Sequence, residues 1–399
     1  MKRILFVDDE PLVLDGLRDL LRRHRKEWDM SFVNSIEAAV NKLRTAPFDV
    51  IVTDIRMPGM DGAALLAQVM NEFPQVVRIV LSGQSGLETA FRTVSVAHQF
   101  LSKPCDAVTL ENTINRACNL RALIHNEKLL EVVGHIDSLP SQPHTYVKLV
   151  ERLRDEHVSA AGIAEILEQD MAMSVKLLQL VNSAFFGMPR RIHRIEDAVT
   201  FLGQAMIRDL VLSVSVFSME RSPRGIDSAE MQRHAMLVGN LAMRIADGAP
   251  GLEDAFLAGM THDMGILLMA SKLPGMFGRS TQSVRENPRP LHVAEAELLG
   301  VTHAELGAYL LGLWGFADPV VEAVAFHHRP TEVLQRSFDM VSAVHIADVL
   351  AQEVGDGHGD VSEAPVAEID PDYVESLGVR HRLDAWRETA RTMVSAEAA

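Results

Sequence analysis

The sequence predicts an α/β domain built on a doubly wound, five-stranded parallel sheet, followed by an all-α domain. In the first 125 residues, short apolar runs alternate with segments of helical apolar spacing, a pattern typical of a parallel sheet covered by helices. After Gly134, apolar residues recur almost only at helical spacing. The length of 399 residues is sufficient for two or three domains, each with a sizeable core.

Five apolar runs are the predicted strands of the first domain: Ile4–Val7, Ser31–Val33, Val50–Thr53, Val77–Leu81 and Gln99–Leu101. Helices are predicted to begin at Pro11, to cover Ile36–Leu43 with Ser35 as N-cap, to cover Gly62–Phe73 before Pro74, and to run from Asp106 to about His125. The helical pattern continues to Val133, and one long helix and two shorter helices fit it equally well.

Composition and charge are those of an ordinary soluble protein. Hydrophobic residues make up 47% of the chain and charged residues 23%. The formal net charge of −16 argues against nucleic acid or an anionic membrane as a non-specific partner. Two cysteines give no disulfide framework, and no apolar stretch reaches the roughly 18 to 20 residues of a membrane span. We therefore expect a cytoplasmic protein without direct nucleic-acid binding or membrane insertion.

Charged and hydroxyl side chains stand where the predicted strands end. Asp8 and Asp9 follow the first strand, Asp54 the third, Ser82 the fourth and Lys103 the fifth. In an open parallel sheet these ends meet at one edge, where ligands bind. Clustered carboxylates suit a hard divalent ion such as Mg²⁺. Lys103 and Ser82 could hold phosphoryl oxygens, and Asp54 could attack phosphorus to form an acyl phosphate.

Residues 1–125 resemble the receiver domain of two-component response regulators. The resemblance rests on four motifs: VDDE at Val7–Glu10, TDIRMPGMDG at Thr53–Gly62, LSG at Leu81–Gly83 and KP at Lys103-Pro104. It implies that a sensor histidine kinase or phosphotransfer protein phosphorylates Asp54. It also implies switch positions at Ser82 and Phe100, contact of Lys103 with the phosphoryl group, and a cis bond before Pro104. The implied magnesium ligands are Asp8, Asp9, Asp54 and the backbone oxygen of Arg56.

The second domain is predicted to contain about a dozen short helices. Their apolar patterns cover Val147–Leu153, Ile163–Leu167, Val175–Val181, Ala198–Leu202, Ile207–Phe217, Met231–Ile245, Ala255–Met269, Ala294–Leu299, Ala304–Trp314, Val320–Phe326 and Met340–Leu350, with two last helices over Asp370–Leu377 and Arg382–Val394. Gly355–Gly359 is predicted to be a loop.

Part of this region resembles the HDOD output domain, an all-α, HD-like relative of metal-dependent phosphohydrolases in bacterial signalling proteins. Met171 and Met173 stand where the family often has Pro and Leu. The matching segments are Leu139-Pro140 with Pro143, Ile163–Asp170, LLQLVNSAFFG at Leu177–Gly187, Ile195–Ala198 and FLG at Phe201–Gly203. The predicted domains are a receiver domain (1–125), a helical linker (126–136), an HDOD domain (137–355) and a C-terminal helical extension and tail (356–399).

Histidines and aspartates recur through the HDOD-like region. Imidazole and carboxylate ligands suit Zn, Mn or Fe-type ions, and such an ion could activate water for phosphoester hydrolysis. The order of these residues resembles the His…HisAsp…Asp signature of the HD superfamily. The candidate metal ligands are His234, His262, Asp263, His303, His327, His328 and Asp348.

The sequence leaves more than one output function open. Phosphodiesterases of the related HD-GYP group carry Lys soon after the His-Asp pair and Gly-Tyr-Pro later, but here Ile266 follows Gly265 and no Gly-Tyr-Pro follows Pro330. This favours a non-catalytic domain that relays phosphorylation of Asp54 to an unknown downstream signalling protein. The alternative is a receiver-gated phosphohydrolase acting on a nucleotide or cyclic dinucleotide. A third hypothesis is that the HDOD domain is a scaffold for a kinase or diguanylate cyclase.

A two-fold homodimer is also expected to be possible, at the sheet face nearest the Asp106 helix.

Overall fold

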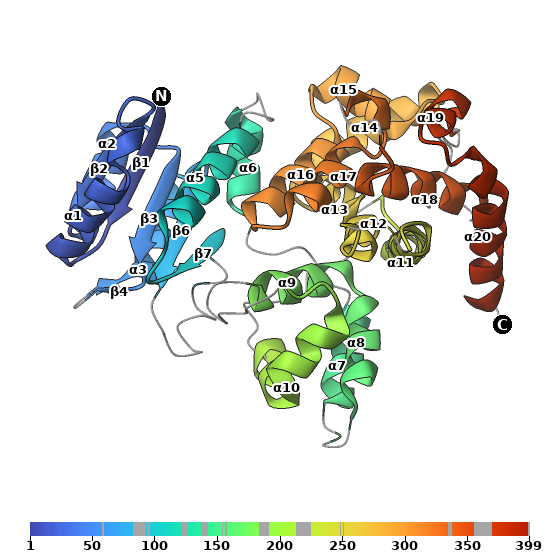
Figure 1. The fold of residues 1–399 in the computed structure, drawn as a ribbon, viewed down its shortest axis with the longest axis horizontal. Coiled ribbons are helices and arrows are strands. Elements are labelled where there is room, and N and C mark those ends of the chain that lie inside the picture. The colour runs from blue at the N-terminus through green and yellow to red at the C-terminus, as the bar shows by residue number, and fades with distance from the viewer. Residues whose placement is uncertain are drawn as a thin grey trace.

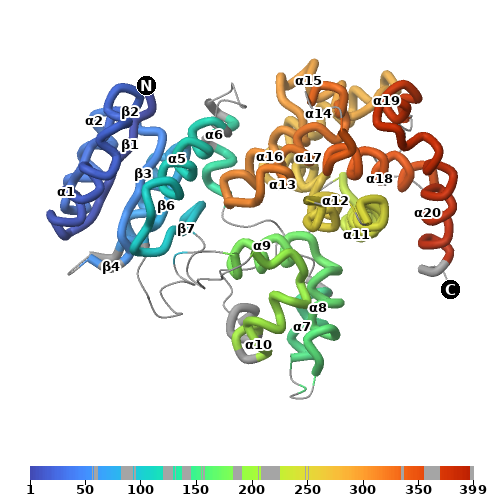
Figure 2. Tube along the Cα trace, in the orientation of Figure 1, coloured from blue at the N-terminus to red at the C-terminus, as the bar shows by residue number. Residues whose placement is uncertain are grey.

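The structure of the 399-residue chain is a computed structural model. It describes residues 1–57, 60–82, 93, 96–121, 127–136, 143–153, 155, 158–182, 191–212, 225–247, 249, 251–333, 337–354 and 369–397. A sheet domain lies at the N-terminal end of the molecule, and the helices from α7 onward form the rest, as Figures 1 and 2 show. Among the described residues, no helix combines the length and the apolar character needed to cross a bilayer.

The N-terminal domain is built on the predicted parallel sheet. Its five strands, in the order β2-β1-β3-β6-β7, are β2 (Trp28–Val33), β1 (Lys2–Val7), β3 (Val50–Asp54), β6 (Val77–Ser82) and β7 (Gln99–Ser102). Ile4, Leu5 and Phe6 are all fully buried, because helices cover both faces of the sheet. The predicted fold class is thus confirmed, and each strand is slightly longer than its apolar run. A short hairpin of β4 (Arg56–Met57) and β5 (Met60–Asp61), which was not predicted, follows β3.

The helices of this domain begin at local capping signals. The elements are α1 (Pro11–Leu20), the 3₁₀ turn η1 (Arg22–His24), α2 (Ile36–Thr45), α3 (Gly62–Glu72) and α5 (Ala107–Arg121). Ser35 accepts a hydrogen bond from the backbone of Ala38, and Asp106 accepts one from the backbone of Thr109, so both predicted N-termini are confirmed. Most residues between β6 and β7 lie outside the described part of the chain. The Lys103–Pro104 bond is cis.

Helix α6 (Glu127–Gly134) packs back onto the sheet domain. A Cβ atom at Gly134 would lie 1.9 Å from the backbone oxygen of Pro74, so this close approach requires glycine. The guanidinium of Arg78 donates a hydrogen bond to the Gly134 oxygen at 2.9 Å. The connection at residues 122–126, which would distinguish one helix from two, lies outside the described residues.

The rest of the described chain is helical. Its elements are α7 (Pro143–Arg152), α8 (Ala160–Glu168), α9 (Met171–Val181), α10 (Ile195–Leu212), α11 (Ser228–Ile245), α12 (Ala255–Thr261), α13 (Met264–Lys272), α14 (Pro274–Glu286), α15 (Leu291–Leu299), α16 (His303–Leu313), α17 (Asp318–Phe326), η2 (Pro330–Glu332), α18 (Met340–Val354), α19 (Pro371–Ser376), η4 (Arg380–Arg382) and α20 (Leu383–Glu397). Helix α20 packs on α11 and α18, so the C-terminal extension belongs to the helical body.

The sequence patterns missed a break between two of these helices and missed one helix altogether. The single pattern over Ala255–Met269 is two helices, because α12 ends at Thr261 and α13 begins at Met264. Helix α14 was not predicted, because its surface is mostly polar and only Phe277, Ser280 and Val284 are buried. The two separate patterns predicted before residue 213 are confirmed, because α10 is interrupted by a kink at Gly203, whose φ of 75° is not helical. The predicted loop at residues 355–359 lies outside the described residues.

Candidate functional site

The carboxyl ends of β1 and β3 bring three predicted carboxylates together. Asp8, Asp9 and Asp54 each offer an oxygen, and these atoms all lie within 4.8 Å of one another. Nζ of Lys103 donates to Oδ2 of Asp8 and to Oδ2 of Asp54, both at 2.7 Å. Burial by itself lowers the pKa of Lys103, but its hydrogen bonds and charge pairing with Asp54 and Asp8 outweigh burial and raise the pKa. The ammonium is therefore fixed in its charged form between two carboxylates.

The other predicted residues of this edge lie on neighbouring elements. Ser82 is the last residue of β6, and Asp54 pairs in register with the residue before it, Leu81. Arg56 begins the hairpin strand β4, two residues after Asp54. The side chains of Ser82 and Arg56 lie outside the described part of the structure. Phe100 is half-buried in β7 and packs against the hydrophobic cores on both faces of the sheet.

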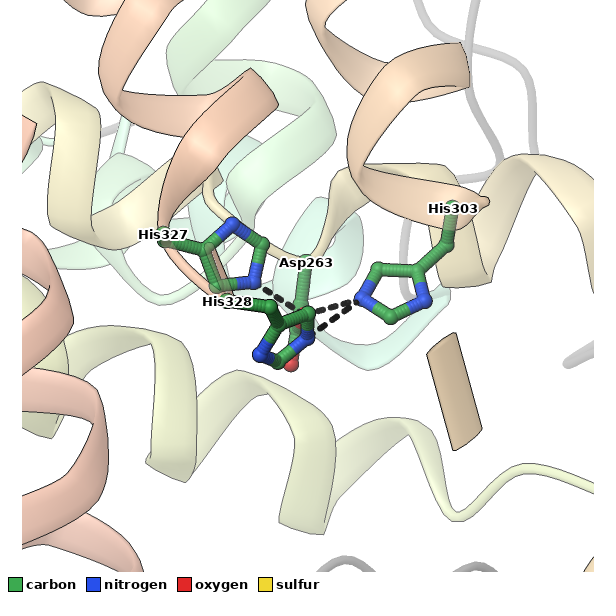
Figure 3. Close-up of side chains that lie close together, drawn as sticks. All are labelled: Asp263, His303, His327 and His328. Atoms are coloured by element: carbon green, nitrogen blue, oxygen red, sulfur yellow. Dashed lines mark hydrogen bonds and ion pairs between the residues drawn. The ribbon is translucent and has the colours of Figure 1, made fainter. Parts of the chain in front are cut away.

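The seven predicted HD-like ligands converge from five places in the helical body. The first set, called here the three-histidine group, consists of Asp263, His303, His327 and His328; the second, the His–Asp group, consists of His234, His262 and Asp348. In each group the ligand atoms lie within 4.8 Å of one another. Figure 3 shows the three imidazoles of the first group gathered around the Asp263 carboxylate. Five of the seven side chains are buried, and those of His234 and His328 are partly buried.

Asp263 belongs to the three-histidine group and also faces the His–Asp group. Its Oδ2 atom is 3.2 Å from Nε2 of His262, whose ring also lies 3.5 Å from Oδ1 of Asp348. Its other oxygen, Oδ1, is 3.2 Å from Nε2 of His303 and 3.6 Å from Nε2 of His327. One carboxylate thus faces both groups, with a different oxygen toward each. This arrangement suits a ligand shared between two ions.

Backbone carbonyls orient two of the imidazoles. Nδ1 of His262 donates to the oxygen of Gly259 at 2.7 Å, and Nδ1 of His327 donates to that of Val324 at 2.8 Å. Each acceptor is a carbonyl at a helix C-terminus, where the backbone has no helical partner. With Nδ1 donating to a carbonyl, each ring turns Nε2 toward Asp263, and this atom carries the lone pair when the imidazole is neutral. Both Nε2 atoms are buried and make no hydrogen bond within the described part of the chain. Such nitrogens fit a metal ion.

The charges of the cluster favour a cation as well. Burial alone raises the pKa values of Asp263 and Asp348, but neighbouring imidazoles outweigh it and hold both well below their usual range. Burial alone lowers the pKa of His262, but the same two carboxylates raise it well above its usual value. Without an ion, protonated imidazole balances the buried carboxylates. A divalent cation would displace those protons and supply the same balance.

Two residues of this site were not predicted. Glu295 of α15 is fully buried and accepts a hydrogen bond from Nδ1 of His303 at 2.7 Å. His292, three residues earlier, stacks on His328 with 4.2 Å between the ring centroids. Neither residue belongs to the HD-like signature. The available signal was a Glu at a core-facing position of an apolar helix, because such a carboxylate needs a partner.

Family models match both parts of the chain. The model of the response regulator receiver domain matches residues 4–115, and that of the HDOD domain matches residues 139–330. This chain joins a response regulator receiver domain to an HDOD domain. The chain is therefore a response regulator with an HD-related output domain. Both matches fall inside the predicted domains, whose boundaries stay predictions.

Relatives resemble parts of the chain. An uncharacterized protein of Treponema pallidum (strain Nichols) is 27% identical over 221 residues, which cover 55% of this chain and 43% of that protein. The hydrogenase transcriptional regulatory protein HoxA of Cupriavidus necator is 34% identical over 122 residues, covering 30% of this chain and 25% of that protein. The chain thus spans less than half of each relative. The solved structure of the MmoQ response regulator from Methylococcus capsulatus is 21% identical, with a TM-score of 0.48, and the match covers 63% of this chain and 98% of that one.

Proposed function

We propose that Asp54 accepts a phosphoryl group from a sensor histidine kinase or phosphotransfer protein, and that this modification controls the HDOD domain as an output module. The observation that carries the proposal is Lys103 held between Asp8 and Asp54 at 2.7 Å from each. A carboxylate paired with a fixed ammonium beside two further carboxylates has the groups that phosphoryl transfer needs.

Each residue has a defined part in this reaction. Oδ2 of Asp54 attacks phosphorus, a P–O bond forms, and the P–N bond of the donor phosphohistidine breaks. Lys103 then pairs with a phosphoryl oxygen in place of the Asp54 oxygen that it now contacts. Mg²⁺ would be held by Asp8, Asp9, Asp54 and the backbone oxygen of Arg56, and it would offset repulsion between carboxylates and phosphoryl oxygens. The hydroxyl of Ser82 would hydrogen-bond the phosphoryl group.

Contacts between the domains support a route for the signal. Gln99, next to Phe100 in β7, donates from its side chain to the oxygen of Gly312 at 3.3 Å. Nε of Arg116 in α5 lies 2.6 Å from Oδ1 of Asp318, and α5 packs on α16 of the HDOD domain. Phe100 is among the residues that line a cavity of about 1020 Å³ between the domains. We infer that phosphorylation repositions Phe100 and loosens this contact.

The same contact bears on the expected homodimer. Because α5 and β7 already contact the HDOD domain within one chain, a two-fold dimer through that face requires the intrachain contact to open. Phosphorylation would then favour the dimer by releasing the face.

A second candidate function is a receiver-gated, metal-dependent phosphohydrolase acting on a nucleotide or cyclic dinucleotide. The observation that favours it is the position of Asp263 between two groups of ligands. The His–Asp group and the three-histidine group would hold Zn, Mn or Fe-type ions, which when bound would activate water. The buried Ile266 offers no charge to a substrate phosphate, and Arg329 is paired with Glu305 at 2.8 Å. The lack of a free positive charge at these two positions favours a regulatory domain that acts on a downstream protein.

The receiver proposal is tested by labelling the protein with a small phosphodonor and Mg²⁺. Wild type and the control Asp19→Asn, which changes an exposed carboxylate of α1, should be labelled, and Asp54→Asn should not be. Label retained in Asp54→Asn would contradict the assignment of the phosphoacceptor.

The two output functions are separated by metal analysis and a hydrolysis assay. Protein purified without chelators is analysed for bound transition ions and for turnover of nucleotides and cyclic dinucleotides. His262→Ala and Asp263→Ala are compared with His381→Ala, which changes an exposed histidine of η4. Turnover that disappears in the first two variants only would establish the enzyme. Bound metal without turnover would support a metal-stabilised regulatory domain, and the absence of metal from wild type would remove the metal centre.

A further inference from the structure

The side chain of Glu295 is hydrogen-bonded to His303. Its side chain is fully buried, and Oε2 accepts two hydrogen bonds from His303, one from the backbone nitrogen at 2.9 Å and one from Nδ1 at 2.7 Å. The other oxygen, Oε1, is buried and has no hydrogen-bond partner among the described residues. A buried carboxylate is unfavourable unless a positive charge lies near it. A metal ion in the three-histidine group, bound to the opposite nitrogen of the His303 ring, would supply that positive charge.

The backbone of His303 is held by other contacts besides its hydrogen bond to Glu295. His303 is the first residue of α16, which begins with a capping box between Thr302 and Glu305. The helix start is pressed against α13, because a Cβ atom at Gly265 would lie 1.9 Å from the oxygen of His303. With the backbone held from both sides, the freedom that remains is that of the imidazole ring. Glu295 sets the orientation and the tautomer of that ring.

The ring points its other nitrogen into the three-histidine group. Nε2 of His303 lies 3.2 Å from Oδ1 of Asp263 and 3.0 Å from Nε2 of His328. When Nδ1 donates to Glu295, Nε2 keeps the lone pair that a metal ion needs. Glu295 therefore acts on the centre through His303 and makes no contact with an ion itself.

The acceptor behind His303 differs from those behind the other oriented imidazoles. His262 and His327 donate from Nδ1 to neutral backbone carbonyls, whereas His303 donates to a carboxylate. A charged acceptor draws the Nδ1 proton more strongly, so it makes Nε2 the better electron donor and stabilises the positive charge of a bound ion. His303 should thus be the strongest imidazole ligand of the site.

We propose that Glu295 is a positioning residue that holds His303 as a metal ligand and gives the three-histidine group a large part of its ion affinity. The proposal rests on the metal centre proposed above. It assigns unequal roles to the two groups, because the His–Asp group has no carboxylate of this kind behind His262. Loss of the Glu295 charge should weaken one ion position about 10- to 100-fold and leave the other unchanged.

The experiment measures ion binding directly. Full-length protein is stripped with a chelator, reloaded with Co²⁺ or Zn²⁺, and titrated against a competing chelator, with the ion count and the Co²⁺ absorption spectrum as readouts. Wild type and Glu297→Gln, an exposed position on the same helix, should hold one ion in each of the two groups. Glu295→Gln keeps the shape of the side chain, and it should release one ion at a 10- to 100-fold lower chelator concentration.

A double variant distinguishes positioning from a structural role. If Glu295 acts through His303, then adding Glu295→Gln to His303→Gln should not weaken ion binding further. Additive losses would overturn the proposal, as would equal ion affinity in Glu295→Gln and wild type. Wild type that binds no ion would instead overturn the metal centre itself. Circular dichroism of the stripped proteins checks that each variant folds. If Glu295→Gln does not fold, Glu295→Asp takes its place, because its shorter side chain draws the carboxylate away from Nδ1 of His303. Ion affinity equal to that of wild type would again overturn the proposal.

Discussion

Nζ of Lys103 lies 2.7 Å from Oδ2 of Asp54 and ties the end of the last strand of the sheet to that of the central one. The same ammonium contacts Asp8, so one cation offsets two carboxylates that would otherwise repel each other. A phosphoryl group or Mg²⁺ at Asp54 would change this charge balance at Lys103.

Replacement of Lys103 by methionine should destabilise the receiver domain and increase its response to Mg²⁺. The variant leaves Asp8 and Asp54 without their shared cation, which should lower the free energy of unfolding by about 1–3 kcal/mol. Added Mg²⁺ should restore more stability to the variant than to wild type, since the ion can replace the missing charge. Urea unfolding with and without Mg²⁺ measures both effects. Arg44→Met, which removes an exposed pair with Glu72, is the control and should change little.

Loss of the Arg116 side chain should separate the two domains. Arg116→Ala removes the ion pair with Asp318 and the hydrogen bond to the oxygen of Phe316. Faster amide hydrogen exchange in α5 and α16, together with a larger radius of gyration in solution scattering, is the expected result. Arg279→Ala, an exposed arginine of α14, should leave both unchanged. If Arg116→Ala exchanges like wild type, the contact does not hold the domains together.

The metal-free protein should lose stability as the pH rises above neutrality. Burial alone lowers the pKa of His303, but Glu295 and Asp263 outweigh it and raise the pKa from 6.5 to about 10. Because the folded state binds this proton more tightly than the unfolded state, its contribution is complete below about pH 6.5 and is lost as the pH rises toward about 10. Thermal unfolding in chelator at stepped pH should show this decline, and His303→Gln should reduce it.

Metal ions should reverse that trend. An ion displaces the protons that balance the buried carboxylates, so its stabilising effect should grow with pH. The measurement is the difference in melting temperature between loaded and chelated protein at each pH. A difference that shrinks between pH 6.5 and 9 would contradict proton displacement at His262 and His303.

Gly265→Ala should destabilise the HDOD domain. The new methyl group would overlap the His303 oxygen, so α13 and α16 would have to move apart, at a cost of about 1–3 kcal/mol. Gly275→Ala is the matched control, because a Cβ atom there meets nothing within 4 Å. Chemical unfolding should show a clear loss for the first variant and little change, or a small gain, for the second.

The parallel sheet could be predicted because its signals are local. Val50–Asp54 is a continuous apolar run that ends in a carboxylate, and a strand buried on both faces between helices must have such a sequence. Ser35 begins α2 because its hydroxyl satisfies a backbone donor three residues away. The residue types at the strand ends, with the order of the strands, were sufficient to predict that Asp8, Asp54 and Lys103 meet.

The helical body shows the limit of such reasoning. The order of its histidines and aspartates indicated which residues belong together, but helical periodicity ran through Ala255–Met269 without showing the break at His262 and Asp263. That break depends on packing, because α13 must approach α16 closely enough for Gly265 to contact the backbone of His303.

The sequence by itself determined the elements, their order and the chemistry available at each site, because periodicity, capping and residue type act over a few residues. Tertiary structure alone decided that the ligands divide into two groups with Asp263 between them, that Glu295 lies behind His303, and that α5 docks on α16. These relations join residues far apart in the chain. Their distances follow from how whole helices pack, which no local pattern records.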